Sequence, residues 1–171
     1  MPRYIAFLRG VSPMNAKMPE LKACFEAAGF AEVRTLLSSG NVAFSSRTLA
    51  ETELVRSAEL AMQSGLGRAF GTFIRSAAQL QALIVADHYA DFDIDRGAKR
   101  VVTFLREAAP PGIALPSARD GARVLKVVGR EVYSAYLPGP KGPVFMSLLE
   151  RHFGADITTR TLETVRKCAA A

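Results

Sequence analysis

The order of apolar and polar positions over the first 87 residues predicts alternating strands and helices. Residues 4–8 form a continuous apolar run, which is typical of a strand buried on both faces. The next apolar residues follow the helical spacing i, i+3, i+4, i+7, at Leu21, Cys24, Phe25 and Ala28. Gly29 is suited to end that helix.

A hairpin is expected next. Residues 33–37 and 42–45 have the composition of two strands, and Ser39-Gly40-Asn41 lies between them. Gly and Asn adopt the positive φ angles that tight hairpins need. We therefore expect the two strands to pair directly.

A second helix and a fourth strand complete this part of the chain. Residues 49–64 predict a helix in which Thr48 is the N-cap and Glu51 completes a capping box. Residues 70–74 predict a strand, and Ser76 is expected to cap a further helix. The order β-α-β-β-α-β predicts a ferredoxin-like (split βαβ) subdomain over residues 1–87.

The remaining residues predict a smaller subdomain of the same kind. Residues 88–98 are acidic and then flexible, so we expect a linker there, followed by a second α+β subdomain over residues 99–171. Its strands are predicted at 100–105, 123–128, 131–137 and near Ile157, and its helices at 144–153 and from Leu162 onward.

A short repeat relates the two parts. Phe7-Leu8-Arg9 and Phe104-Leu105-Arg106 each end an apolar run, and a glycine turn follows at Gly40 and at Gly129. The second interval is eight residues shorter, which is about two helical turns. We therefore expect an α+β protein built as a tandem of two ferredoxin-like subdomains, the second with a degraded first helix.

Charge is distributed unevenly along the chain. Residues 1–97 hold ten basic and ten acidic residues, whereas residues 98–171 hold twelve basic and six acidic ones. The formal net charge of +6 therefore belongs entirely to the second part. This excess indicates an anionic partner, although charge also serves solubility alone.

Three segments resemble the bacterial domain of unknown function 1697 family. They are residues 3–11 (RYIAFLRGV), residues 39–44 (SGNVAF), and residues 158–160 (TTR) with Thr164-Val165. The resemblance spans nearly the whole chain and implies a ferredoxin-like α+β fold, but it implies no activity. The loop at residues 12–16 is shorter than in the family, and Thr161-Leu162-Glu163 replaces the family's Asn-Trp-Asn.

The sequence does not predict a known catalytic, metal or cofactor site. The two histidines, His88 and His152, lack the serine and carboxylate context of a triad. Cys24 and Cys168 are far apart and lack metal-ligand spacing. The aspartates at 91, 93 and 95 lack the remaining ligands of a calcium loop, and the glycines at 65, 67 and 71 precede a strand rather than a helix. We expect no cofactor and no metal.

The residues do favour an anion site. Backbone N–H groups beside Arg9, Gly10 and Lys17, next to the turn at Gly40 and Asn41, are suited to hold a phosphate or carboxylate. Lys141 opens a predicted helix, and Arg160 is added by its position in the family. We hypothesise a non-catalytic binder of an anionic small molecule or of a nucleic acid backbone.

Two alternatives stay open. The same residues could clamp a phosphorylated or carboxylated substrate of an enzyme, or the chain could pair with a protein through an exposed sheet edge. No apolar run reaches the length of a membrane span and two thiols fit the cytoplasm, so we expect a cytoplasmic protein without a membrane partner. A homo-oligomer also stays open, although nothing in the sequence indicates one.

Overall fold

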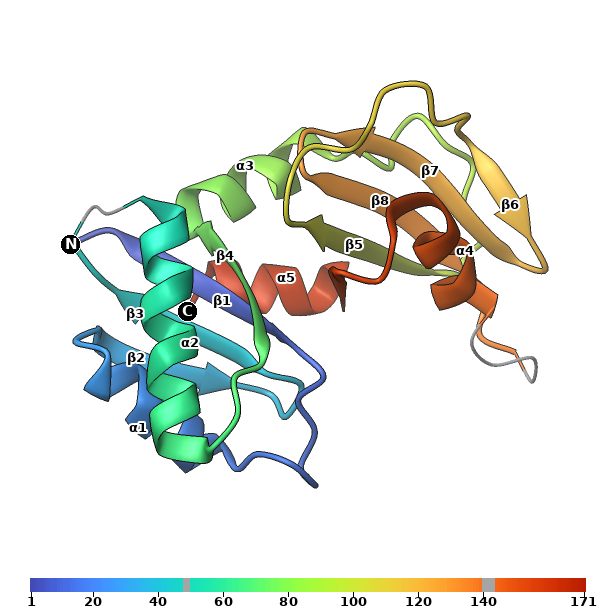
Figure 1. The fold of residues 1–171 in the computed structure, drawn as a ribbon. Coiled ribbons are helices and arrows are strands. Elements are labelled where there is room, and N and C mark those ends of the chain that lie inside the picture. Colours follow the sequence, from blue (N-terminus) through green and yellow to red (C-terminus); the bar gives the residue numbers. More distant parts are fainter. Residues whose placement is uncertain (48–49, 140–143) are drawn as a thin grey trace. The chain divides into compact units, whose positions relative to one another are not determined.

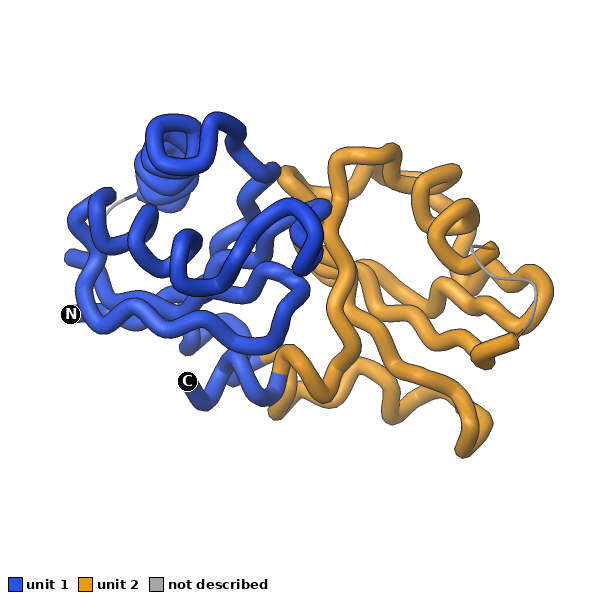
Figure 2. Tube along the Cα trace, turned by 90° about the horizontal axis from the view of Figure 1, so that it is seen from below, with its two compact units in different colours: residues 1–82, 166–171 blue, residues 83–165 orange. Residues whose placement is uncertain are grey.

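The computed structural model describes residues 1–47, 50–139 and 144–171 and divides into two compact units. Unit 1 comprises Met1–Ala82 together with Arg166–Ala171, and unit 2 comprises Leu83–Val165 (Figure 2). Each unit contains one antiparallel sheet. The protein is therefore an α+β protein with two sheets, as the sequence predicts at this coarse level. No helix in the described ranges is long and apolar enough to cross a membrane.

Unit 1 has the predicted element order (Figure 1). Its strands pair in the order β2-β3-β1-β4. Two of its helices, α1 and α2, cover one face of this sheet, where Leu21, Phe25, Leu54 and Met62 pack on the strands. The elements are β1 (Arg3–Arg9), α1 (Met18–Ala27), β2 (Ala31–Leu36), β3 (Asn41–Ser45), α2 (Glu51–Leu66), β4 (Gly71–Ser76) and α3 (Ala77–Ala86).

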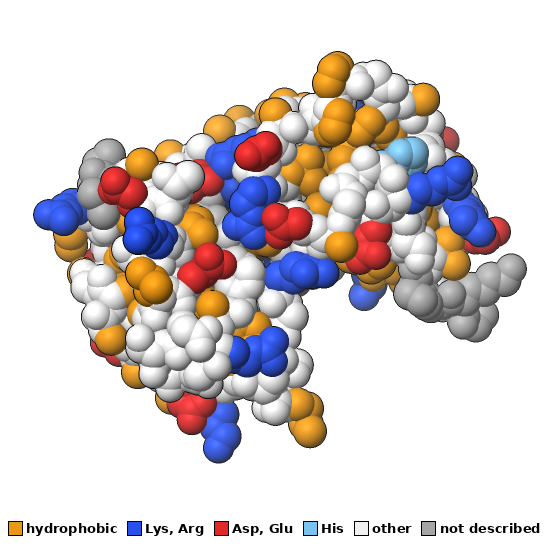
Figure 3. All heavy atoms as spheres, viewed as in Figure 1, with side chains coloured by type: hydrophobic (Ala, Val, Ile, Leu, Met, Phe, Trp, Pro, Cys, Tyr) orange, Lys and Arg blue, Asp and Glu red, His pale blue; other side chains and the backbone are white. Residues whose placement is uncertain are grey.

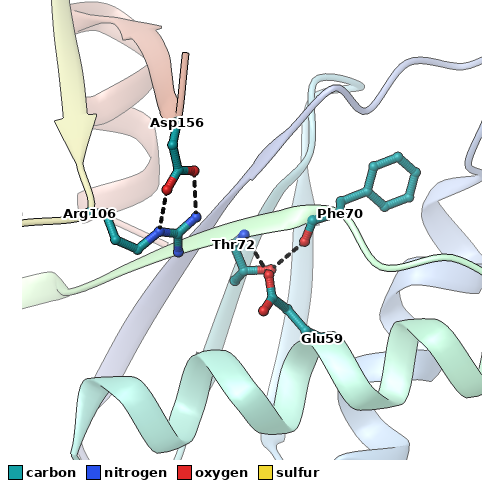
Figure 4. A network of polar contacts seen from close by, with 5 residues as sticks. All are labelled: Glu59, Phe70, Thr72, Arg106 and Asp156. Carbon is teal, nitrogen blue, oxygen red and sulfur yellow. Dashed lines mark hydrogen bonds and ion pairs between the residues drawn. The ribbon is translucent and has the colours of Figure 1, made fainter. Parts of the chain in front are cut away.

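Polar side chains fix the ends and the edge of these elements. Ser76 and Gln79 cap α3 reciprocally: Ser76 N donates to Gln79 Oε1 at 2.7 Å and Gln79 N donates to Ser76 Oγ at 3.0 Å. The predicted cap is thus confirmed. On β4, at the edge of the sheet, Thr72 N donates to Glu59 Oε2 of α2 at 3.2 Å (Figure 4), which satisfies a donor that the edge would leave unpaired.

The start of α2 differs from the prediction. The helix begins at Glu51, and its N-cap is Ala50, which offers no side-chain hydrogen bond. Thr48, the predicted N-cap, lies outside the described residues. The predicted capping box at Glu51 is therefore wrong, because Glu51 occupies the first position of the helix rather than the third.

Unit 2 contains a five-stranded sheet of order β6-β7-β8-β5-β9. Helix α4 packs on one face through Phe145, Leu148 and Leu149. The predicted hairpin is observed, and the segment after β5 forms no helix. The elements from this point of the chain onward are β5 (Lys99–Leu105), β6 (Ser117–Arg119), β7 (Ala122–Val128), β8 (Glu131–Tyr136), α4 (Val144–Phe153), β9 (Ile157–Thr161) and α5 (Leu162–Ala169). The residues of α5 from Arg166 on belong to unit 1.

The end of the chain returns to unit 1. Arg3 Nε donates to the carbonyl oxygen of Ala171 at 3.1 Å, and Gln81 Nε2 donates to that of Ala169 at 3.2 Å. Residues 166–171 thus group with residues 1–82. This division differs from the boundaries expected from the sequence, which place all of residues 99–171 in the second subdomain, because composition carries no signal for a chain end that packs back on the start.

The repeated Phe-Leu-Arg segments have equivalent hydrogen bonds. Leu8 N donates to the carbonyl oxygen of Gly40 at 2.8 Å, and Leu105 N donates to that of Arg130 at 2.9 Å. Each bond joins the end of the central strand to the residue before the next strand of the sheet. Gly40 is therefore the counterpart of Arg130 rather than of Gly129, a shift of one residue.

Candidate functional site

The predicted loop and turn of unit 1 lie side by side at one end of the sheet. A Cβ atom added to Gly40 would lie 2.8 Å from the Cβ of Val11 and 3.0 Å from that of Leu8. Gly40 also has a φ of +84°, so this position admits only glycine without strain. The structure thus places the loop at Val11 against the turn at Gly40, and Gly40 allows the loop to pack on the turn.

Asn41 also has a structural role. It is fully buried, and its Nδ2 donates to the carbonyl oxygen of Leu36 and to Ser39 Oγ, both at 3.0 Å. The side chain therefore holds the hairpin turn closed. Its amide nitrogen is directed into the turn.

The loop after Arg9 uses its own acceptors for several of its N–H groups. Ser12 N donates to Asn15 Oδ1 at 2.9 Å, and Met14 N donates to Ser12 Oγ at 3.3 Å. The carbonyl oxygen of Ser12 accepts bonds from Asn15 N and Ala16 N. These four donors are occupied, and the side chains of Arg9 and Lys17 are exposed at the two ends of the loop. Lys141 lies outside the described residues.

Sequence analysis did not single out Arg68, which lies at the same end of the sheet. Arg9 pairs with Gly71 across β1 and β4, so the segment before β4 starts where β1 ends. Arg68 is exposed there, and its guanidinium lies 4.4 Å from the centre of the Phe70 ring. Only the pairing of the two strands reveals this neighbour. The helical face of unit 1 mixes cations and carboxylates (Figure 3), as is usual for a solvated surface.

A denser group of cations lies on the sheet of unit 2. In one cross-strand row, Arg123 of β7 and Arg100 of β5 flank Ala135 of β8. In the next row, Lys126 of β7 lies opposite Tyr133 of β8. We call the surface formed by Arg100, Arg123, Lys126 and Arg160 the basic face.

A β-bulge places two of these cations on the same face. Successive residues of a strand point to opposite faces, so residues 123 and 126 of a regular strand would diverge. The register of β7 against β8 shifts between Val124 and Lys126, where one extra residue is inserted. The extra residue, Leu125, is buried and restores the parity, so that Arg123 and Lys126 share a face.

Arg160 belongs to the second row of the basic face. It pairs with Val102, which in turn pairs with Tyr133, so the row runs from Lys126 on β7 to Arg160 on the edge strand β9. Arg160 is only 9% exposed, and its Nη1 donates to Thr158 Oγ1 at 2.8 Å and to the carbonyl oxygen of Thr159 at 2.7 Å. It therefore lies back along its own strand and borders the face.

Three cations of the basic face keep their charges available. Within the described ranges, Arg100, Arg123 and Lys126 form no ion pair with a carboxylate. By contrast, Arg106 at the end of β5 binds Asp156 through two bonds of 3.1 and 2.9 Å (Figure 4). The opposite face of the sheet is covered by α4, because Val132 and Val124 pack on that helix. The cations thus lie on the side away from α4.

Aromatic rings lie among these cations. The His88 ring is stacked on Tyr133 at 4.4 Å between centroids, and Tyr89 meets Tyr133 edge-on at 5.7 Å. Burial, and then the nearby charge of Lys126, lower the pKa of His88, while Asp87 and Glu131 oppose that effect. Burial raises the pKa of Tyr133, and Glu131 adds to the increase. Both rings are therefore neutral near pH 7.

The described part of the chain contains no group of side chains suited to bind a metal ion. No cluster of three or more His, Cys, Asp or Glu side chains is found there.

A hollow of about 690 Å³ lies between α1 and α2, lined mostly by small residues such as Ala23, Ala61 and Gly65. It contains the buried thiol of Cys24, whose pKa is raised by burial and by Glu20.

The comparisons with known proteins identify the family and the fold. Residues 1–133 match the family described as "Protein of unknown function (DUF1697)". This match covers most of the chain, so the chain belongs to that family, and the resemblance noted in the sequence is confirmed. No curated protein matches the chain.

A solved structure supports the fold. The conserved bacterial protein SP0830 from Streptococcus pneumoniae is similar to this chain with a TM-score of 0.72 and 18% identity. The alignment covers 99% of this chain and 97% of that one. At this identity the likeness shows a common fold and nothing about activity.

Proposed function

We propose that this member of the DUF1697 family binds an anionic ligand on the basic face of unit 2. The observation that carries the proposal is that Arg100, Arg123 and Lys126 share one face of a sheet and form no ion pair with a carboxylate among the described residues. Unneutralised cations in neighbouring positions attract anions and favour the release of bound counterions on binding.

The spacing of the cations favours a ligand with several phosphates. Arg123 and Arg100 are two strands apart, which corresponds to about 10 Å between their backbones. A nucleic acid backbone offers a series of phosphate charges that can meet cations spread over three strands. We infer that the ligand is a phosphate chain, and that a single strand of nucleic acid is the natural probe.

One end of the unit 1 sheet is a weaker candidate for the anion site than the basic face. Arg9, Lys17 and Arg68 are exposed at one end of the sheet, but Gly40 and Asn41 hold the turn and the loop uses several of its own N–H groups. Of the residues that the sequence predicts for the site, Arg160 alone borders the basic face among those described. The proposal therefore moves the site from unit 1 to unit 2.

The two sheets support a tandem of ferredoxin-like subdomains. The order β2-β3-β1-β4 of unit 1 corresponds to β7-β8-β5-β9 of unit 2, and the segment with β6 stands in the place of α1. The equivalent bonds of Leu8 and Leu105 agree with this relation. We also place the protein in the bacterial cytoplasm, which the two free, buried thiols of Cys24 and Cys168 support.

Fluorescence anisotropy of a labelled single-stranded oligonucleotide of about 12 nucleotides tests the proposal. The variants Lys126→Gln and Arg100→Gln should weaken binding and reduce the salt slope by roughly one each between about 50 and 200 mM salt. Arg56→Gln removes an exposed cation of α2 and is the matched control. The proposal fails if the face variants and the control bind alike, and Arg9→Gln reveals whether unit 1 holds the site.

A competition experiment distinguishes recognition of phosphate from recognition of the bases. Inorganic polyphosphate carries the same phosphate charge without bases. If polyphosphate displaces the oligonucleotide fully at equal phosphate concentration, the face recognises phosphate alone. If it does not, the bases contribute to the affinity through ring contacts.

A further inference from the structure

The segment that joins α3 to β5 lies on the same side of the sheet as the basic face. Residues 87–95, which we call the acidic segment, run on the side of the unit 2 sheet away from α4 (Figure 1). Its Tyr89 is buried, and the hydroxyl donates to the carbonyl oxygen of Val101 at 2.6 Å. Together with the stacking of His88 on Tyr133, this bond fixes the segment on the sheet.

The acidic segment contacts two cations of the basic face without neutralising them. Arg123 Nη1 donates to the carbonyl oxygen of Asp93, and the Arg100 guanidinium lies 5.7 Å from the centre of the Tyr89 ring. These contacts use the main chain and a ring. They occupy positions that a ligand phosphate would otherwise take.

Four exposed carboxylates accompany these contacts. Asp87, Asp91, Asp93 and Asp95 lie along the segment, and none of them forms an ion pair within the described residues. Their charges therefore act on the basic face through solvent, and they lower its attraction for anions at low salt. The acidic segment thus lies over the basic face, and the chain leads directly from this segment into the sheet at β5.

We propose that the acidic segment is an intramolecular competitor that reduces the affinity of the basic face for a phosphate chain. This inference rests on the proposed function, since it describes regulation of the same site. A phosphate chain must displace the main-chain contact at Arg123 and overcome the field of the carboxylates. Removing carboxylates from the acidic segment therefore strengthens binding of the phosphate chain, whereas removing cations from the basic face weakens it.

A charge-matched pair of triple variants tests the inference. Asp91→Asn/Asp93→Asn/Asp95→Asn removes three carboxylates whose side chains make no hydrogen bond within the described residues, so the fold is preserved. Glu20→Gln/Glu26→Gln/Glu53→Gln removes three exposed carboxylates of unit 1 and changes the net charge equally. The same single-stranded oligonucleotide is the probe for both.

The expected result is tighter binding by about threefold or more for the first triple variant than for the second at low salt, with the difference shrinking as salt is added. Hydrogen exchange of amides in residues 88–96 should also increase when the oligonucleotide binds. If both triple variants bind the oligonucleotide with equal affinity, the acidic segment is not a competitor, and the proposed function is unaffected. Absence of binding by the wild type and by both variants overturns the proposed function itself.

Discussion

Arg123 and Lys126 point to the same face of the second sheet although they lie three positions apart along β7. The extra residue of the bulge, Leu125, produces this arrangement. Without it, one of the two charges would be directed at the hydrophobic residues beneath α4, where an unpaired cation is costly. The bulge therefore both protects the core and concentrates charge on the face away from α4.

A buried hydroxyl in the same sheet gives the first prediction. Thr103 is fully buried, and its Oγ1 has no hydrogen-bond partner in the described part of the chain. Thr103→Val replaces the hydroxyl with a methyl group of similar size, so we expect the free energy of unfolding to increase by about 1 kcal/mol. Urea unfolding of the variant measures the change.

Thr72→Val is the matched control for that substitution. Thr72 is equally buried, but its Oγ1 donates to the carbonyl oxygen of Phe70 at 2.9 Å. Removing this hydroxyl should lower the free energy of unfolding by about 1 kcal/mol. Equal effects of the two substitutions would show that the Thr103 hydroxyl has a partner.

Alanine substitutions at two glycines distinguish the energetic cost of backbone strain from the cost of a steric conflict. Gly10 and Gly40 both have a φ of +84°. An added Cβ at Gly10 has no atom within 4 Å, whereas at Gly40 it would lie 2.8 Å from Val11. Gly10→Ala should cost about 1–2 kcal/mol from backbone strain alone, and Gly40→Ala should cost about 1–3 kcal/mol more because neighbouring side chains must shift.

Thermal or urea unfolding of these two alanine variants measures the difference. Equal destabilisation would mean that the loop at Val11 moves away from the turn without cost. In that case the loop and the turn would not form the rigid end of the sheet described above.

His88 predicts a pH dependence of stability. Its pKa is lowered in the folded protein, mainly by burial, so the unfolded chain binds a proton more readily. The free energy of unfolding should therefore fall as the pH is lowered through about 6.5, the ordinary pKa of histidine, and level off below the folded pKa.

His88→Phe keeps a ring against Tyr133 and removes the titrating group. Between pH 7.5 and 5.5, roughly one unit either side of the ordinary histidine pKa, the variant should lose less stability than the wild type in urea unfolding. An identical pH dependence in both proteins would show that His88 does not titrate in an altered environment.

The sequence predicts the local elements well because their signals are local. The apolar run before Arg9, the turn at Gly40 and the cap at Ser76 each depend on a few neighbouring residues, and the structure contains all three. The start of α2 was misplaced because several polar residues precede it, and any of them could serve as a cap.

The basic face cannot be predicted from the sequence because it depends on long-range pairing. The bulge in β7 has no clear sequence signal, so the shared face of Arg123 and Lys126 is visible only once the strands are registered. The same holds for the contact of Tyr89 with Val101, which turns an expected linker into a fixed segment. Gly40 and Asn41 are residue types common both in turns and in anion sites, so the sequence alone does not separate these two roles.

Amide chemical shifts of ¹⁵N-labelled protein titrated with the single-stranded oligonucleotide test the central claim most directly. The basic face predicts that the largest changes occur at Arg100, Arg123, Lys126 and their neighbours on β5, β7 and β8, and that added salt reverses them. Changes confined to residues 9–17 and 37–41, or no changes at low salt, would contradict the assignment of the site to unit 2.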